Sequence, residues 1–118
     1  MCIRGDVYFI DFGKNIGSKQ SGIRPGVVVS NDKANAYSPV VTVVPLTGKI
    51  HKKRFLPTQV LIPKDSGSGL RRDSLALAEQ VATIDKECLK DYCGNVSDLQ
   101  IMERLTLALQ IQIGAVGS

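Results

Sequence analysis

The chain has 118 residues and a mass of 12.7 kDa, with 43% hydrophobic, 22% charged and 5% aromatic residues and a formal net charge of +4. This length supports one ordinary core, so we expect residues 1–118 to form a single domain. The longest apolar stretches, residues 40–46 and 101–116, contain polar interruptions and do not resemble bilayer spans. The first residues, MCIRGDVYF, lack a hydrophobic signal core, so we expect a cytoplasmic protein with no membrane partner.

The positive charge belongs to the first part of the chain. Residues 1–72 carry 12 Lys or Arg against 4 Asp or Glu, a net charge of +8, whereas residues 73–118 carry 3 against 7, a net charge of −4. Two stretches without any acid, residues 13–23 (GKNIGSKQSGI) and 48–57 (GKIHKKRFLP), read as long loops and supply much of the excess. A polyanion is the expected ligand, with single-stranded RNA as the first candidate.

Short strands dominate the first two thirds of the sequence. Runs of β-branched, aromatic and other apolar residues, bounded by Gly, Pro, Asn and Ser, predict strands over residues 7–12, 25–30, 40–46, 59–62 and 74–81. The Asn-Asp pair that follows the second run predicts a turn. The fold class expected is mainly β with short helices (α+β), built as a small barrel or a strongly curved antiparallel sheet.

Helical signals appear only after residue 84. Residues 85–93 predict a short helix that stops before a glycine. A second helix is predicted to begin at Ser97, which can form a capping box with Gln100, and to end at Gly114. Its apolar face should pack on the sheet through Ile101, Met102, Leu105, Ala108 and Leu109.

Metal and cofactor chemistry find little support in the sequence. Cys2, Cys88 and Cys93 have no metal-ligand spacing, and we interpret the last two as small apolar positions. The chain has no P-loop and no metal-binding carboxylate pattern, so we expect no metal and no cofactor. The single histidine, His51, titrates in a range that suits proton transfer, but a lone histidine in a solvated cationic loop is more often a bystander.

A metal-free enzyme acting on RNA would use the ribose 2′-OH as nucleophile and would need positive charge at the phosphate. Arg24 closes the first loop just before Pro25, which favours an extended conformation, and its guanidinium can bind two phosphate oxygens. Thr47 follows another predicted strand, where its hydroxyl can reach a phosphate or a 2′-OH. From spacing alone, a surface ion-pair role for Arg24 and a strand-end role for Thr47 stay open.

Five segments in order resemble the MazF/PemK family of toxins from bacterial toxin–antitoxin systems. They are RGDVYFIDF (4–12), GSKQSGIRPGVVVSND (17–32), NAYSPVVTVVPLT (35–47), LPTQV (56–60) and DSLALAEQVATID (73–85). The resemblance implies a curved antiparallel sheet of the SH3-like barrel type, of the PemK/CcdB kind, assembled as a homodimer. It also implies a cognate antitoxin whose acidic C-terminal segment occupies the RNA channel.

The same resemblance implies a sequence-specific, metal-independent endoribonuclease that cuts single-stranded messenger RNA and leaves 2′,3′-cyclic phosphate and 5′-hydroxyl ends. Its catalytic residues fall on Arg24, in G-x-R-P, and on Thr47, in P-x-T. RNA contacts carry over to Ser18, Lys19, Gln20, Glu79 and Gln80. To these the charge of the second loop adds Lys49, Lys52, Lys53 and Arg54, with Phe55 as a stacking candidate.

Two departures from the family pattern matter. Some relatives use a histidine in the first long loop, which here has none. Residues 63–72 (PKDSGSGLRR) are glycine-rich and look variable, so no acid–base role is transferred to Asp65 or Asp73. A non-enzymatic, CcdB-like toxin that binds DNA gyrase is the alternative function, and an RNA-binding module without catalysis is a weaker one.

Overall fold

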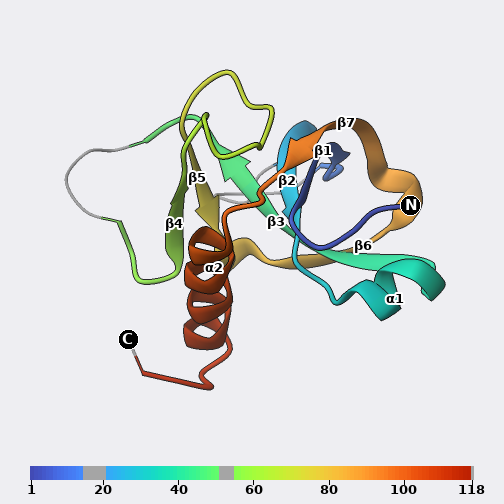
Figure 1. Cartoon of the computed structure of the whole chain (residues 1–118). Helices are drawn as coiled ribbons and strands as arrows, with labels where there is room; N and C mark the ends of the chain where they lie inside the picture. Colours follow the sequence, from blue (N-terminus) through green and yellow to red (C-terminus); the bar gives the residue numbers. More distant parts are fainter. Residues whose placement is uncertain (15–20, 51–54, 118) are drawn as a thin grey trace.

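The computed structural model describes residues 1–14, 21–50 and 55–117. Seven strands, two α-helices and two 3-10 helices form within them (Figure 1). The strands are β1 (Asp6–Asp11), β2 (Ile23–Val28), β3 (Val40–Thr47), β4 (Gln59–Ile62), β5 (Ser74–Leu77), β6 (Ala82–Asp85) and β7 (Leu89–Asn95). The helices are α1 (Asp32–Tyr37), η1 (Ala78–Gln80), η2 (Lys86–Cys88) and α2 (Leu99–Gln112).

The strands form one antiparallel sheet with β3 as its hub. Its order is β4-β5-β3-β2-β1-β7, and β6 pairs with β3 outside this path. The first half of β3 pairs with β6 and its last two residues pair with β5, while β2 pairs with its middle. The predicted mainly β class is therefore confirmed, as an open antiparallel sheet with short helices.

Apolar side chains pack on both faces of the sheet, in two clusters. The larger cluster joins the sheet to α2, which lies in front of β4 and β5 in Figure 1. The buried α2 residues are Ile101, Met102, Leu105 and Ala108, with Leu109 partly buried beside them. This is the face predicted from the helical spacing of the sequence. A smaller cluster on the other side contains Cys2, Ile10, Val28, Val41 and Val43.

The boundaries of α2 confirm one expectation and correct another. The N-cap is Asp98 and not Ser97: its carboxylate accepts hydrogen bonds from the backbone N–H of Gln100 at 2.9 Å and of Ile101 at 3.4 Å. An ionised acceptor at this position interacts favourably with the positive end of the helix dipole, which a hydroxyl cannot do. The end is as predicted, because Gly114 follows the helix with φ +78°.

The helix predicted over residues 85–93 is wrong. Only the turn η2 is helical, and β7 follows it directly along β1, with Tyr8 opposite Tyr92 and Val7 opposite Gly94. The rings of Tyr8 and Tyr92 pack edge to face with their centroids 5.4 Å apart. Pairing with β1 supplies backbone hydrogen bonds to this segment and overrides its local helical preference.

Two further local predictions need correction. The predicted turn after β2 opens α1, because the Asn31 side chain accepts a hydrogen bond from the backbone N–H of Ala34 and caps the helix. The strand predicted over residues 74–81 is interrupted by η1, where the chain leaves β5 and turns toward β6. The two strands then pair with different parts of β3.

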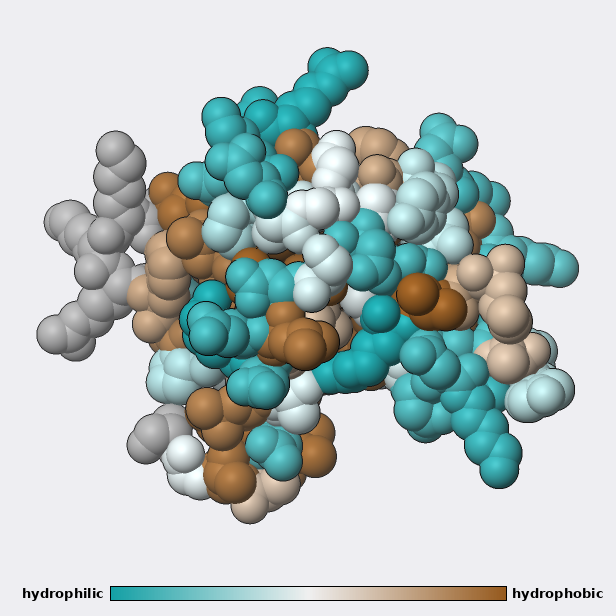
Figure 2. All heavy atoms as spheres, viewed as in Figure 1, coloured by the Kyte–Doolittle hydropathy of each residue, from teal (hydrophilic) through white to brown (hydrophobic). Residues whose placement is uncertain are grey.

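The surface around α2 retains apolar side chains. Leu99 and Ile113 are 77% and 73% exposed, and Leu107 and Val116 are also exposed. Figure 2 shows such brown side chains gathered around α2 and the C-terminal end of the chain. Across the described parts of the chain, α2 included, no helix has the length and apolar character needed to cross a membrane.

Candidate functional site

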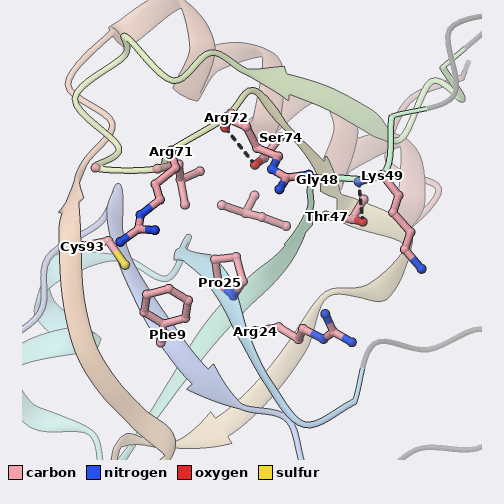
Figure 3. A pocket seen from close by; sticks show the side chains of 13 residues that line it. Phe9, Arg24, Pro25, Thr47, Gly48, Lys49, Arg71, Arg72, Ser74 and Cys93 are labelled. Carbon is pink, nitrogen blue, oxygen red and sulfur yellow. Dashed lines mark hydrogen bonds between the residues drawn. The ribbon is translucent and has the colours of Figure 1, made fainter.

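A cleft of about 720 Å³ lies beside the start of β2 and the end of β3 (Figure 3). Strands β1, β2, β3 and β7 contribute to its walls, together with the loop formed by residues 63–73 between β4 and β5. The described residues that line it are Phe9, Arg24, Pro25, Leu46, Thr47, Gly48, Lys49, Gly69, Leu70, Arg71, Arg72, Ser74 and Cys93.

The cleft brings together Arg24 and Thr47, the two residues predicted to be catalytic. Strands β2 and β3 are antiparallel neighbours, and the last pair of their register is Gly26 opposite Pro45. Arg24 precedes that pair by two residues on one strand and Thr47 follows it by two on the other. The two side chains therefore come to the same end of the strand pair and reach one cleft.

The Thr47 hydroxyl and the Arg24 guanidinium each make a hydrogen bond within the described part of the chain and keep further hydrogen-bonding groups for a ligand. The backbone N–H of Lys49 donates to Thr47 Oγ1 at 3.1 Å, which fixes the hydroxyl as an acceptor on that side and leaves its proton for a ligand. Arg24 is exposed, and its Nε donates to the Ser21 carbonyl at 3.2 Å. This bond orients a planar guanidinium whose other N–H groups suit a phosphate.

Positive charge dominates the cleft. Four of the described lining residues are cationic, namely Arg24, Lys49, Arg71 and Arg72, and none of the described lining residues carries a carboxylate. Charges of one sign along a concave wall reinforce each other's potential and attract a polyanion. Lys49 was predicted from the charge of its loop, whereas Arg71 and Arg72 were missed. The only sequence signal for them is two adjacent arginines after a glycine-rich stretch.

The loop of residues 63–73 is held against β7 by backbone contacts that require glycine. Gly69 has φ +74°, and a Cβ there would lie 2.0 Å from the Cys93 carbonyl oxygen. A Cβ on Gly94 would lie 2.3 Å from the Gly67 oxygen, which accepts a 2.9 Å hydrogen bond from the Asn95 N–H. These close contacts fix the position of the loop against β7. That position determines where Arg71 and Arg72 reach the cleft.

Cys93 contributes an uncharged wall to the cleft. Burial raises the pKa of its thiol above the ordinary value of 9.0, although a hydrogen bond from the Phe9 backbone acts in the opposite direction. A thiol with a raised pKa stays protonated at neutral pH and is a poor nucleophile. The interpretation of Cys93 as a small apolar position therefore fits its surroundings, because it packs from β7 against the larger apolar cluster.

A family comparison decides what this fold and cleft belong to. The model of the family described as "PemK-like, MazF-like toxin of type II toxin-antitoxin system" matches residues 3–113 of the chain. The chain belongs to the PemK/MazF toxin family. The match runs from before β1 to the residue after α2, so it includes every strand of the sheet and the whole cleft.

Curated PemK/MazF relatives are similar over nearly the full chain. Endoribonuclease EndoA from Bacillus subtilis is 42% identical, and the alignment covers 96% of this chain and 95% of the relative. Endoribonuclease MazF from Staphylococcus saprophyticus is 44% identical, with 97% of this chain and 92% of the relative covered.

Solved structures agree with the fold. A mycobacterial endoribonuclease in complex with its cognate antitoxin superposes with a TM-score of 0.77 at 28% identity, covering 100% of both chains. MazF from Deinococcus radiodurans gives a TM-score of 0.78 at 18% identity, with 96% of each chain covered. The second likeness concerns the fold alone.

Three of the other residues predicted to contact RNA, namely Glu79, Gln80 and Phe55, are described by the structure and are not among the residues that line the cleft. The Glu79 carboxylate accepts hydrogen bonds from Thr58 Oγ1 at 2.9 Å and Gln59 Nε2 at 2.8 Å, and so ties β4 to η1. Gln80 belongs to η1, and Phe55 is 42% exposed. The predicted contacts Ser18, Lys19, Gln20, Lys52, Lys53 and Arg54, together with His51, fall outside the described residues.

Proposed function

We propose that this chain is the toxin of a type II toxin–antitoxin system and acts as a sequence-specific, metal-independent endoribonuclease on single-stranded RNA, chiefly messenger RNA. The observation that carries the proposal is the meeting of Arg24 and Thr47, from two different strands, in a cationic cleft. Membership of the family and the endoribonuclease names of relatives more than 40% identical support it. RNA binds in this cleft and is cut there.

The reaction we propose is an internal transesterification. The ribose 2′-oxygen attacks the adjacent phosphorus and loses its proton, the bond from phosphorus to the 5′-oxygen breaks, and that oxygen gains a proton. The products are a 2′,3′-cyclic phosphate and a 5′-hydroxyl. Arg24 binds the non-bridging oxygens, where negative charge grows in the transition state, and Thr47 donates a hydrogen bond to the same phosphate. Arg24 is assigned charge stabilisation because a guanidinium stays protonated.

The partners proposed are RNA, a second copy of the chain and a cognate antitoxin, all in the cytoplasm. Similar chains have been solved with antitoxins: a mycobacterial endoribonuclease in complex with its cognate antitoxin, and MazE-MazF from Deinococcus radiodurans. An acidic antitoxin segment has the charge to bind a cleft lined by four cations, and it would then exclude RNA. Membership of the family supports the proposed homodimer.

A cleavage assay with mapped products tests the proposal. The purified chain is incubated with a long RNA in EDTA, and cut sites and end groups are determined. We expect cuts at a short motif with cyclic phosphate ends, abolished in Arg24→Ala and strongly reduced in Thr47→Ala, with both variants folded and able to bind antitoxin. Wild-type-like cleavage by Arg24→Ala would contradict the catalytic assignment. No cleavage by the wild-type chain, with binding to gyrase, would favour the CcdB-like alternative.

A further inference from the structure

Arg72 stands apart from the other cations of the cleft because it packs directly over the residue that follows Thr47. A Cβ built on Gly48 would lie 2.8 Å from Arg72 Cδ and 3.5 Å from Arg72 Nε. The arginine side chain thus occupies the space that any larger residue at position 48 would fill. Figure 3 shows its charged end beside Gly48, on the side of the cleft across from Arg24.

The backbone of Arg72 is also anchored. Its carbonyl oxygen accepts a hydrogen bond from the hydroxyl of Ser74, a buried residue at the start of β5, at 3.3 Å. The Asp73 carboxylate accepts one from the backbone N–H of Lys64 at 2.9 Å, which closes the loop upon itself. Together with the glycine contacts to β7, these bonds hold the backbone at Arg72 in place before any ligand arrives. Such preorganisation is what an electrostatic contribution to catalysis requires.

We propose that Arg72 is a further catalytic residue, which binds the non-bridging oxygens of the scissile phosphate from the wall opposite Arg24. The inference rests on the proposed ribonuclease function and adds a residue to it. Two guanidinium groups from opposite walls match the two non-bridging oxygens better than one. Because negative charge on these oxygens increases as the 2′-oxygen attacks, Arg72 acts mainly on the rate of cleavage and less on the affinity for RNA.

The test separates rate from binding. Single-turnover cleavage at saturating RNA gives the rate, and the dissociation constant of a 2′-O-methyl RNA, which cannot be cut, gives binding. We expect Arg72→Ala to lower the rate about 100-fold and to weaken binding less than about tenfold, and Arg72→Lys to recover part of the rate. Arg104→Ala removes an equal charge from the exposed side of α2 and should change neither value.

Gly48→Ala provides an independent test that leaves every charge in place. The new methyl group can be accommodated by moving the end of the Arg72 side chain, so the fold should survive while the guanidinium is displaced. We expect Gly48→Ala to lower the cleavage rate, as Arg72→Ala does. The double variant should cut RNA at nearly the same rate as Arg72→Ala alone. Thermal melts of both variants close to that of the wild type would show that the folded state is kept.

The outcomes are distinguishable from those that test the proposed function. A wild-type chain that cuts RNA, with an Arg72→Ala variant within about threefold of its rate, would overturn this inference alone. The inference would also be overturned if the double variant lost cleavage rate by the product of the two single losses. Gly48→Ala would then lower the rate by an effect that does not involve Arg72. A wild-type chain that cuts no RNA would overturn both proposals.

Discussion

The catalytic role proposed for Thr47 rests on its hydroxyl group. The Lys49 backbone N–H donates to its oxygen, so the hydroxyl proton is free to point into the cleft. We expect Thr47→Ser to keep most of the cleavage rate, and Thr47→Val, which has the same shape, to lower it about 100-fold. The measurement is the single-turnover rate on one RNA. Equal rates for the serine and valine variants would assign Thr47 a structural role.

Arg24 and Thr47 could be predicted from the sequence because each lies near a proline at the end of an apolar strand pattern. Arg24 directly precedes Pro25, which restricts its backbone to extended conformations, and Thr47 follows Pro45 by two residues at the end of the run 40–46. Arg72 could not be predicted in this way. Its place in the cleft depends on where the loop of residues 63–73 lies on β7, a contact between segments separated by more than 20 residues.

Buried acidic groups should make the protein less stable at high pH. Burial raises the pKa of the thiols of Cys2 and Cys93 above 9.0 and the pKa of the Tyr8 phenol above 10.0. Below pH 9 these thiols are protonated in both states and the stability is fully present. As the pH rises above 9, the unfolded chain loses these protons more readily than the folded chain, so the free energy of unfolding falls.

Urea unfolding between pH 7 and pH 10 measures this effect. We expect the free energy of unfolding to be nearly constant at first and to decline above pH 9, and Cys2→Ala to decline less steeply than the wild type. The slope against pH is the readout, because the lost packing of Cys2 lowers stability equally at every pH. A steeper decline in the variant would contradict the assignment.

At the level of elements, the observed N-cap of α2, Asp98, can be compared with Ser97, the N-cap predicted from the sequence. Asp98→Ala removes the acceptor of two backbone hydrogen bonds and should lower the free energy of unfolding by about 1 kcal/mol. Ser97→Ala is the matched control and should change it by less than about 0.5 kcal/mol, as expected at an exposed position. Urea unfolding of both variants decides between them, and a larger loss at position 97 would restore the predicted capping box.

Elements were predictable where a strand has a strong apolar pattern of its own. The strand predicted over residues 59–62 has the bounds of β4, and that over residues 40–46 falls one residue short of β3. Residues 85–93 failed because most are charged or polar, and their strand conformation depends on β1, about 80 residues earlier in the chain. Local propensity cannot anticipate a partner at that distance.

For the whole molecule, part of the positive charge carried by residues 1–72 gathers at one cleft. The four cleft cations all belong to residues 1–72, the part with a net charge of +8, whereas α2 and most of the acidic residues belong to the remainder. A polyanion approaching the protein is therefore attracted to one side. This attraction acts over the distance set by the ionic strength, so salt concentration is the variable that measures it.

We therefore expect RNA binding to weaken steeply with salt. Each phosphate neutralised on a single strand contributes about −0.7 to the slope of log affinity against log salt, so four cleft cations predict a slope of about −3 or steeper. The dissociation constant of a 2′-O-methyl RNA, measured over a series of NaCl concentrations, gives this slope. Arg71→Ala should make it shallower by about 0.7, whereas Arg104→Ala, on the exposed side of α2, should leave it unchanged. An affinity that hardly depends on salt would mean that base stacking, and not the cationic cleft, holds the RNA.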